Sequence, residues 1–130
     1  MKREVKVWVT FSDELKFGEG RAQLLELIEK YGSLQQAAKD LGMSYRNAWG
    51  YLGQLERAAG FTFVQRAPGG GPRSGMRLTL EAKRFLGRYR RFRHGLDRAV
   101  KAQFEKAFGG IDPRQPDRDA ILSSSGHRGG

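Results

Sequence analysis

The sequence predicts a mainly α-helical protein with a small β-sheet. Three segments place apolar residues at the spacings of three and four that an amphipathic helix requires: residues 21–31, 33–59 and 80–108. Residues 4–11 instead alternate between apolar and polar side chains, as a half-buried strand does. A glycine-rich loop at residues 67–75 separates two further short segments with strand character. We therefore expect long helices around a few short strands.

The chain is strongly basic for its size. Among its 130 residues, 24 are Lys or Arg and 14 are Asp or Glu, which gives a net charge of +10 and an isoelectric point near 10.4. Residues 57–93 concentrate this excess, with ten basic side chains against the single acid Glu81. A clustered positive surplus indicates a polyanionic partner, most often nucleic acid.

Several function classes lack the residues they need. The chain has no cysteine, and its two histidines, His94 and His127, are far apart, so we expect no disulfide, no metal site and no cofactor. No constellation of acids, histidine and nucleophile suggests a catalytic residue, so we expect no enzyme activity. No apolar run approaches the roughly 20 residues that span a bilayer, and the start lacks a signal-peptide core. A cytoplasmic protein without membrane contact is expected.

Val5, Val7, Val9 and Phe11 share one face of the predicted N-terminal strand. This strand could add to the small sheet that forms further along the chain. Two glycines then break the chain before the helix at residues 21–31, whose leucines form its buried side.

The segment at residues 33–59 predicts two helices joined by a tight turn. Ser33 and Gln36 have the spacing of a capping box at the start of the first helix. Gly42 supplies the backbone freedom that a sharp turn needs, and Ser44 can cap the second helix. Small alanines on both sides of the turn let the helices cross closely, as a helix-turn-helix demands. An ordinary helical hairpin is the alternative.

Residues 61–66 and 76–79 predict two strands that flank the glycine-rich loop. Such a hairpin after the second helix is the wing of a winged helix-turn-helix. The glycines of the loop and the arginines around it suit contact with a DNA backbone or minor groove. A nucleotide-phosphate loop is the alternative, but no Lys-Ser/Thr helix start follows the glycines, and Pro72 removes one amide.

The long helix at residues 80–108 is expected to begin after Thr79, which can cap it. One apolar stripe runs along about eight turns, more than a small domain needs to cover. We therefore expect this helix to pair with its symmetry mate in a homodimer, the alternative being a helix folded back on its own domain. The predicted dimerisation residues are Phe85, Tyr89, Phe92, Leu96, Val100 and Phe104. Residues 109–130 have the composition of a disordered tail.

Two stretches together carry a family resemblance. They are the start of the second helix, Ser44-Tyr45-Arg46 with Ala48-Trp49, and the glycine-rich wing that ends in Leu78-Thr79. With the preceding helices they resemble the DNA-binding domain of ModE-type molybdate-responsive transcriptional regulators, which is itself similar to the winged helix of LysR-type regulators. The resemblance covers about residues 4–105. It implies a homodimer that binds double-stranded DNA at a palindromic operator through two recognition helices.

The sequence departs from that family after the long helix. Members that sense molybdate carry it in small β-barrel domains beyond this point, whereas here only the short tail follows. We therefore expect that this chain alone does not bind molybdate or tungstate. The chain is either a stand-alone member or a truncated piece of a longer protein.

Groove geometry assigns the expected DNA contacts. The recognition-helix residues are Ser44, Tyr45, Arg46, Asn47, Trp49 and Gly50. Arg46 is the best reader of guanine, and Asn47 could read adenine. Core packing is the alternative for Trp49. Contacts to phosphate or from the wing are expected from Ser33, Gln35, Arg66, Arg73, Ser74, Arg77, Lys83 and Arg84.

These expectations divide the chain into three parts. They are a DNA-binding domain at residues 1–79, a linker and dimerisation helix at 80–108, and the tail at 109–130. The predicted function is that of a sequence-specific, DNA-binding transcriptional regulator. A non-specific architectural DNA-binding protein would share the fold and charge and would lack only the base-reading side chains. An RNA-binding winged helix is a further alternative.

Overall fold

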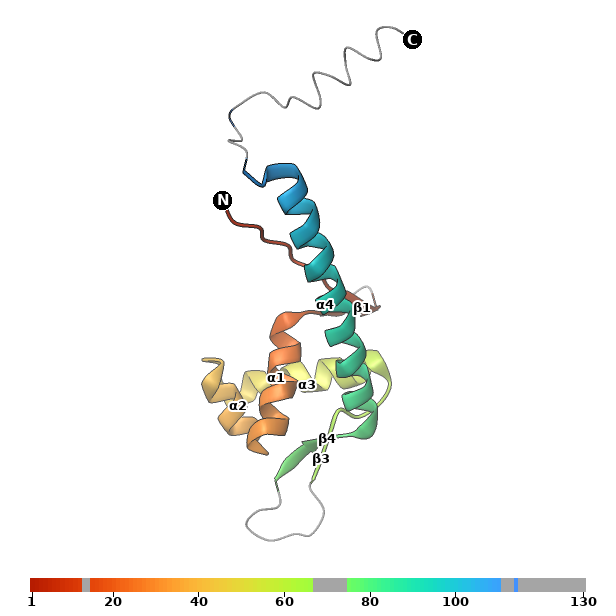
Figure 1. Cartoon of the computed structure of the whole chain (residues 1–130). Coiled ribbons are helices and arrows are strands. Elements are labelled where there is room, and N and C mark those ends of the chain that lie inside the picture. The colour runs from red at the N-terminus through yellow and green to blue at the C-terminus, as the bar shows by residue number, and fades with distance from the viewer. Residues whose placement is uncertain (13–14, 67–74, 111–113, 115–130) are drawn as a thin grey trace, which may run out of the picture. The chain divides into compact units, whose positions relative to one another are not determined.

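Helices dominate this computed structural model, which describes residues 1–12, 15–66, 75–110 and 114. The elements in chain order are β1 (Val9–Ser12), β2 (Leu15–Phe17), α1 (Glu19–Tyr31), α2 (Leu34–Asp40), α3 (Tyr45–Ala59), β3 (Val64–Arg66), β4 (Met76–Leu78) and α4 (Leu80–Phe108) (Figure 1). The predicted mainly α-helical fold is confirmed. The described residues fall into two compact units, one within Lys6–His94 and one made of Met1–Val5 and the described residues from Gly95 onward.

α1 begins at Glu19, slightly earlier than predicted. Its apolar face is buried, with Leu25 and Ile28 fully covered. Gly32 ends the helix with a φ of +64°, and its N–H donates to the Ile28 carbonyl at 2.7 Å. Glycine is the usual residue at such a stop because it adopts the left-handed backbone without strain. The chain can therefore turn at once into α2.

α2 and α3 form the predicted helix-turn-helix. The Ser33 hydroxyl accepts the Gln36 N–H at 3.1 Å, and the Ser44 hydroxyl accepts the Asn47 N–H at 3.0 Å. Both helix starts are therefore capped as expected. Gly42, between the helices, has a φ of +67°. Alanines on the buried faces of both helices let them pack closely.

The N-terminal strand differs from the prediction. β1 starts only at Val9, and Val5 is 44% exposed. β1 pairs antiparallel with β2 in a sheet of its own and does not join β3 and β4. This hairpin is held by its aromatic side chains, since Phe11 and the fully buried Phe17 lie edge to face with ring centroids 6.5 Å apart. Among the described strands, β1 therefore does not make the addition to the wing sheet that its pattern allowed.

The wing stem is the antiparallel pair β3 and β4, as predicted. Three hydrogen bonds fasten β4 and its end to other elements. The Met76 N–H donates to the Gly32 carbonyl at 2.9 Å, and the Leu78 N–H donates to the Glu29 carboxylate at 2.9 Å. The Thr79 N–H donates to the Phe63 carbonyl at 3.0 Å. The base of the wing is therefore anchored on the C-terminal end of α1.

α4 has the predicted bounds, and its N-terminal half belongs to the first compact unit. The Thr79 hydroxyl caps it by accepting the Ala82 N–H at 3.1 Å. Phe85 and Tyr89 pack on Phe17, with ring centroids 4.8 and 5.0 Å away. Tyr89 is only 2% exposed. Phe85 and Tyr89 were expected in a dimer interface, because a monomer was expected to leave the stripe partly exposed. Tyr89 packs on Phe17, and the half-buried Phe85 also contacts Phe11 and Phe63, within the unit Lys6–His94. A role of these two residues in a dimer interface stays a prediction.

The second unit contains the C-terminal half of α4. Leu96, Val100 and Phe104 are half-buried there, and the Phe104 and Phe108 rings lie 5.5 Å apart. A pocket in this unit is lined by Phe104 and by the first four residues of the chain, Met1, Lys2, Arg3 and Glu4. Gly110, with a φ of +70°, follows the end of the helix. Most of the expected tail lies outside the described residues.

Candidate nucleic-acid interface

The first turns of α3 present an exposed aromatic and basic surface. Tyr45 is 51% exposed and Trp49 is 43% exposed, and their rings meet edge to face at 6.1 Å. Arg46 beside them is also exposed. The opposite face of the helix is buried through Ala48, Leu52 and Leu55. Core packing is therefore not the role of Trp49, and the side chains predicted to meet base edges do face outward.

Two other predicted recognition residues are also exposed. The Asn47 backbone N–H is occupied by the Ser44 cap, and its side chain is on the surface. A Cβ built at Gly50 would have no atom within 4 Å, so this glycine leaves an open strip of helix backbone. A flat strip suits close approach of a large rigid partner such as a DNA groove.

The predicted phosphate contacts at the start of α2 differ in availability. The Gln35 side chain is exposed. Ser33 is only half-exposed, and its hydroxyl oxygen already accepts the Gln36 N–H, which leaves the hydroxyl proton to donate. Together they mark the positive end of the α2 dipole, where anions are favoured.

The wing arginines do not converge. Arg66 pairs with Met76 and Arg77 pairs with Gln65, so the two arginines lie on opposite faces of the two-stranded stem. Both side chains are exposed. Arg73 and Ser74, the predicted contacts at the tip of the wing, lie outside the described residues.

Lys83 and Arg84, at the start of α4, have different surroundings. Lys83 Nζ lies 3.4 Å from Glu29 Oε1 and links α4 to α1. The hydrogen bond from the Leu78 N–H, with Lys83 beside it, lowers the pKa of the Glu29 carboxyl despite its partial burial. Arg84 is exposed. Arg84 is therefore the better placed of the two to meet a phosphate.

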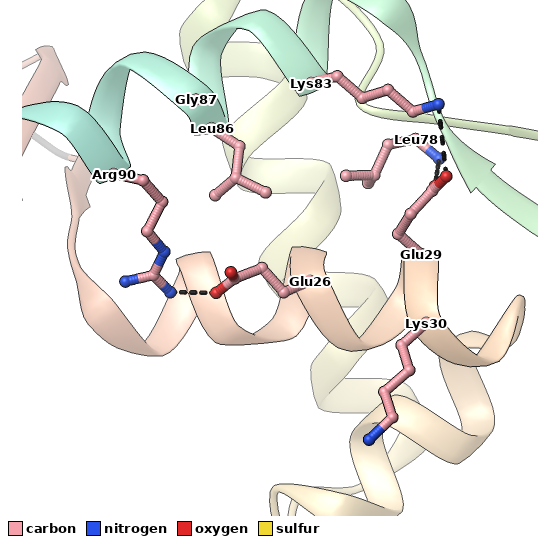
Figure 2. A pocket seen from close by; sticks show the side chains of 8 residues that line it. All are labelled: Glu26, Glu29, Lys30, Leu78, Lys83, Leu86, Gly87 and Arg90. Carbon is pink, nitrogen blue, oxygen red and sulfur yellow. Dashed lines mark hydrogen bonds and ion pairs between the residues drawn. The ribbon is translucent and has the colours of Figure 1, made fainter.

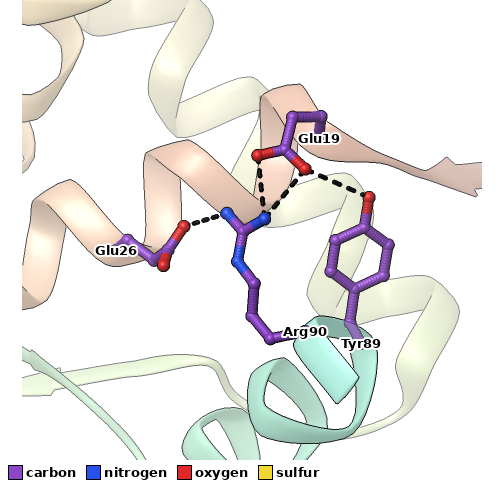
Figure 3. Close-up of polar contacts among 4 residues, drawn as sticks. All are labelled: Glu19, Glu26, Tyr89 and Arg90. Atoms are coloured by element: carbon purple, nitrogen blue, oxygen red, sulfur yellow. Dashed lines mark hydrogen bonds and ion pairs between the residues drawn. The ribbon is translucent and has the colours of Figure 1, made fainter. Parts of the chain in front are cut away.

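A charged brace that the sequence did not indicate joins α1 to α4 (Figure 3). Arg90 Nη1 donates to both carboxylate oxygens of Glu19, at 2.8 and 2.9 Å, and Nη2 donates to Glu26. The Tyr89 hydroxyl lies 3.5 Å from Glu19 Oε2. Burial and the Glu19 charge raise the pKa of Tyr89. The basic cluster of α4 is thus partly a set of internal contacts and not only a surface for anions.

An open groove of about 560 Å³ lies between α1 and α4 (Figure 2). Leu78 and Leu86 form its apolar part. Its charged rim is made of Glu26, Glu29, Lys30, Lys83 and Arg90. Figure 2 shows that Lys83 and Arg90 turn toward the two glutamates and are engaged by them. The groove is therefore close to neutral, although several cations line it.

Sequence reasoning missed the contact between Arg21 and Tyr51. The Arg21 guanidinium stacks 4.4 Å from the Tyr51 ring centroid and donates to Gln54 Oε1 at 3.2 Å. Burial lowers the pKa of Arg21, and the Tyr51 hydroxyl partly offsets this lowering. The contact ties the N-terminal end of α1 to the middle of α3. Arg21 and Tyr51 are 30 positions apart, so no local sequence pattern indicates this contact.

Among the described residues, no group of His, Asp or Glu side chains could hold a metal ion. Within the same residues, no helix is both long enough and apolar enough to cross a membrane.

Part of this chain is similar in sequence to known proteins. Residues 21–83 match the family described as bacterial regulatory helix-turn-helix protein, LysR family. The chain is 32% identical over 89 residues to the DNA-binding transcriptional dual regulator ModE of Escherichia coli K12, a match that covers 68% of this chain and 34% of that protein. It is 33% identical over 99 residues to the molybdenum transport protein ModE of Azotobacter vinelandii, covering 73% and 37%. It is 29% identical over 110 residues to the molybdenum-pterin-binding protein MopB of Rhodobacter capsulatus, covering 85% and 40%.

The matched region contains most of α1, the helix-turn-helix, the wing stem and the first residues of α4. The chain spans 34–40% of the length of these relatives. The matching family is described as one of regulatory helix-turn-helix proteins, and ModE of Escherichia coli is described as a DNA-binding regulator. Residues 21–83 therefore form a LysR-type bacterial regulatory helix-turn-helix domain, which is similar to the helix-turn-helix domain of the ModE regulators.

Proposed function

We propose that this chain is a sequence-specific transcriptional regulator that binds a palindromic DNA operator as a homodimer. The observation that carries the proposal is the exposed start of α3. Tyr45, Arg46 and Trp49 stand out from a helix whose other face is buried. Such a face meets base edges in the major groove, and an arginine there can bind the two acceptors of one guanine.

The proposed dimer contact is the remaining apolar stripe of α4. Phe92 is 47% exposed, and Leu96, Val100 and Phe104 continue its spacing along the same helix. Apolar residues that recur every four positions over these turns suit pairing with an identical helix. A two-fold dimer would present two copies of α3 to half-sites about one helical turn apart or a multiple of it.

The names of several relatives refer to molybdenum, but the described residues of this chain do not favour an oxyanion site. The groove between α1 and α4 gathers Lys83 and Arg90, and both are engaged by Glu26 and Glu29. Carboxylates at that position repel an anion. We therefore propose that residues 1–130 bind DNA and not molybdate or tungstate.

The function is tested by binding to genomic fragments, random duplex and RNA at two salt concentrations. Selection of a few genomic fragments with inverted repeats, bound at least about 1,000-fold more tightly than random duplex, is the expected result. Equal affinity for all duplexes would instead indicate an architectural DNA-binding protein. Preference for RNA would overturn the assignment.

A further inference from the structure

A second basic position lies on the exposed side of α3, near its C-terminal end. Arg46, Gly50, Gly53 and Arg57 recur at intervals of four, three and four residues. This spacing places them on one face of the helix, away from the buried Ala48, Leu52 and Leu55. The strip therefore starts and ends with an arginine and has bare backbone between.

The Arg57 side chain lies along this strip. A Cβ built at Gly53 would come within 3.2 Å of Arg57 Nη1 and within 3.9 Å of Cζ. The guanidinium therefore rests on the helix backbone one turn before its own Cα, in the direction in which helical side chains lean. Gly53 leaves room for it, and the cation faces the same side as Arg46.

Nothing in the described part of the chain neutralises this guanidinium. The only acid of α3 is Glu56, and its carboxylate accepts the Phe63 N–H at 2.6 Å. The ion pairs of the described residues involve Lys83 and Arg90, not Arg57. The charge of Arg57 is therefore available to a partner.

The spacing between the two arginines says which part of DNA each would meet. The Arg57 guanidinium rests over Gly53, seven positions beyond Arg46, which corresponds to about 10 Å along the helix axis. The major groove is about 12 Å wide, so its edge lies about 6 Å from its middle. If Arg46 lies at the middle of the groove, the Arg57 guanidinium lies past its edge, where the phosphates of the flanking strand are.

We propose that Arg57 is a further DNA-contacting residue, which binds a backbone phosphate at the edge of the groove. The proposal rests on the proposed function, because it needs α3 to lie in the groove. A purely structural role is the rival explanation, since a cation in the last turn of a helix also stabilises it through the helix dipole. The two roles differ in what they change: one affects DNA binding and its salt dependence, and the other affects stability.

The experiment compares the full chain with the variants Arg57→Ala and Arg57→Lys. Arg98→Ala removes the same charge from an exposed arginine of α4 and is the matched control. Anisotropy titrations on the selected operator and on random duplex are run over a salt series, with a thermal melt of each protein. We expect Arg57→Ala to bind both duplexes about 3- to 10-fold more weakly and to lower the slope of log K against log salt by about one unit. Arg57→Lys should stay within about 2-fold of the native protein, because a phosphate contact needs charge and not the guanidinium fork.

If Arg57→Ala binds as the native protein does, with the same salt slope, Arg57 does not contact DNA and the inference fails while the proposed function stands. If the variant loses affinity for the operator alone, Arg57 reads a base and the phosphate assignment is wrong. If Arg98→Ala lowers affinity and slope equally, the effect is one of net charge and the inference also fails. If the native protein binds no duplex, the proposed function itself is wrong.

Discussion

Replacement of Glu29 by alanine should loosen the wing from the body of the domain. Its carboxylate accepts the Leu78 N–H at 2.9 Å and lies 3.4 Å from Lys83 Nζ. A hydrogen bond to a charged group contributes about 1.5–3 kcal/mol. The Lys83 pair is partly exposed and adds about 0.2–1 kcal/mol. We therefore expect Glu29→Ala to lower the free energy of unfolding by about 2–3 kcal/mol, a fall in Tm of roughly 10–20 °C for a domain of this size.

Urea denaturation followed by circular dichroism measures this change. Glu29→Gln keeps an acceptor oxygen and should cost about 1 kcal/mol. Lys83→Ala isolates the ion pair, and Glu105→Ala, on the exposed surface of α4, is the matched control and should have little effect. A Glu29→Ala protein within about 0.5 kcal/mol of the native one would refute the idea that this carboxylate anchors the wing.

The Glu29 contribution should also depend on pH. Its folded-state pKa lies below the ordinary value of 4.5, because the Leu78 N–H stabilises the charged form. Its stabilising effect is therefore fully present above about pH 4.5 and is lost as the pH falls through the lowered folded-state pKa. The stability difference between native protein and Glu29→Gln should shrink on acidification below pH 4.5, and a difference that grows there would contradict the assignment.

Four further predictions concern DNA reading, dimerisation, anion binding and the core. Arg46→Ala should cost about 1–3 kcal/mol at the operator and relax preference at one position per half-site, and equal weakening on random duplex would show that α3 does not read bases. Replacing Phe92 and Leu96 together by glutamate should give a folded monomer with weaker operator binding, and a native protein that sediments as a monomer at micromolar concentration would contradict the dimer. Calorimetric titration of the chain with molybdate should show no stoichiometric site, and a sub-micromolar one would overturn that view. Phe17→Ala should destabilise the domain by about 3–5 kcal/mol in urea denaturation, because the fully buried ring contacts Phe11, Phe85 and Tyr89, and a loss under about 1 kcal/mol would mean that the core repacks around the gap.

Helix caps and turns could be predicted from the sequence alone. The helix-turn-helix is indicated by Ser33, Gly42 and Ser44, because caps and turns depend on residues only a few positions apart. The periodic stripe of α4 gave the correct bounds of that helix for the same reason. The exposed face of α3 follows from its buried face, so the orientation of Arg46 and Trp49 could also be predicted.

Tertiary structure decided the contacts between distant residues. The three-residue strand β2 is too short for a periodic signal, so only its pairing with β1 defines it. The apolar stripe of α4 does not itself say which part meets its own domain. Packing on Phe17 assigns Phe85 and Tyr89 to the core. The role of a charged residue is equally ambiguous in the sequence. Arg90 is one of many cations there, and only the fold brings it to Glu19, 71 positions away. A periodic apolar pattern shows that one face of a helix will be buried. Which residues bury it depends on the tertiary fold, because they come from distant parts of the sequence.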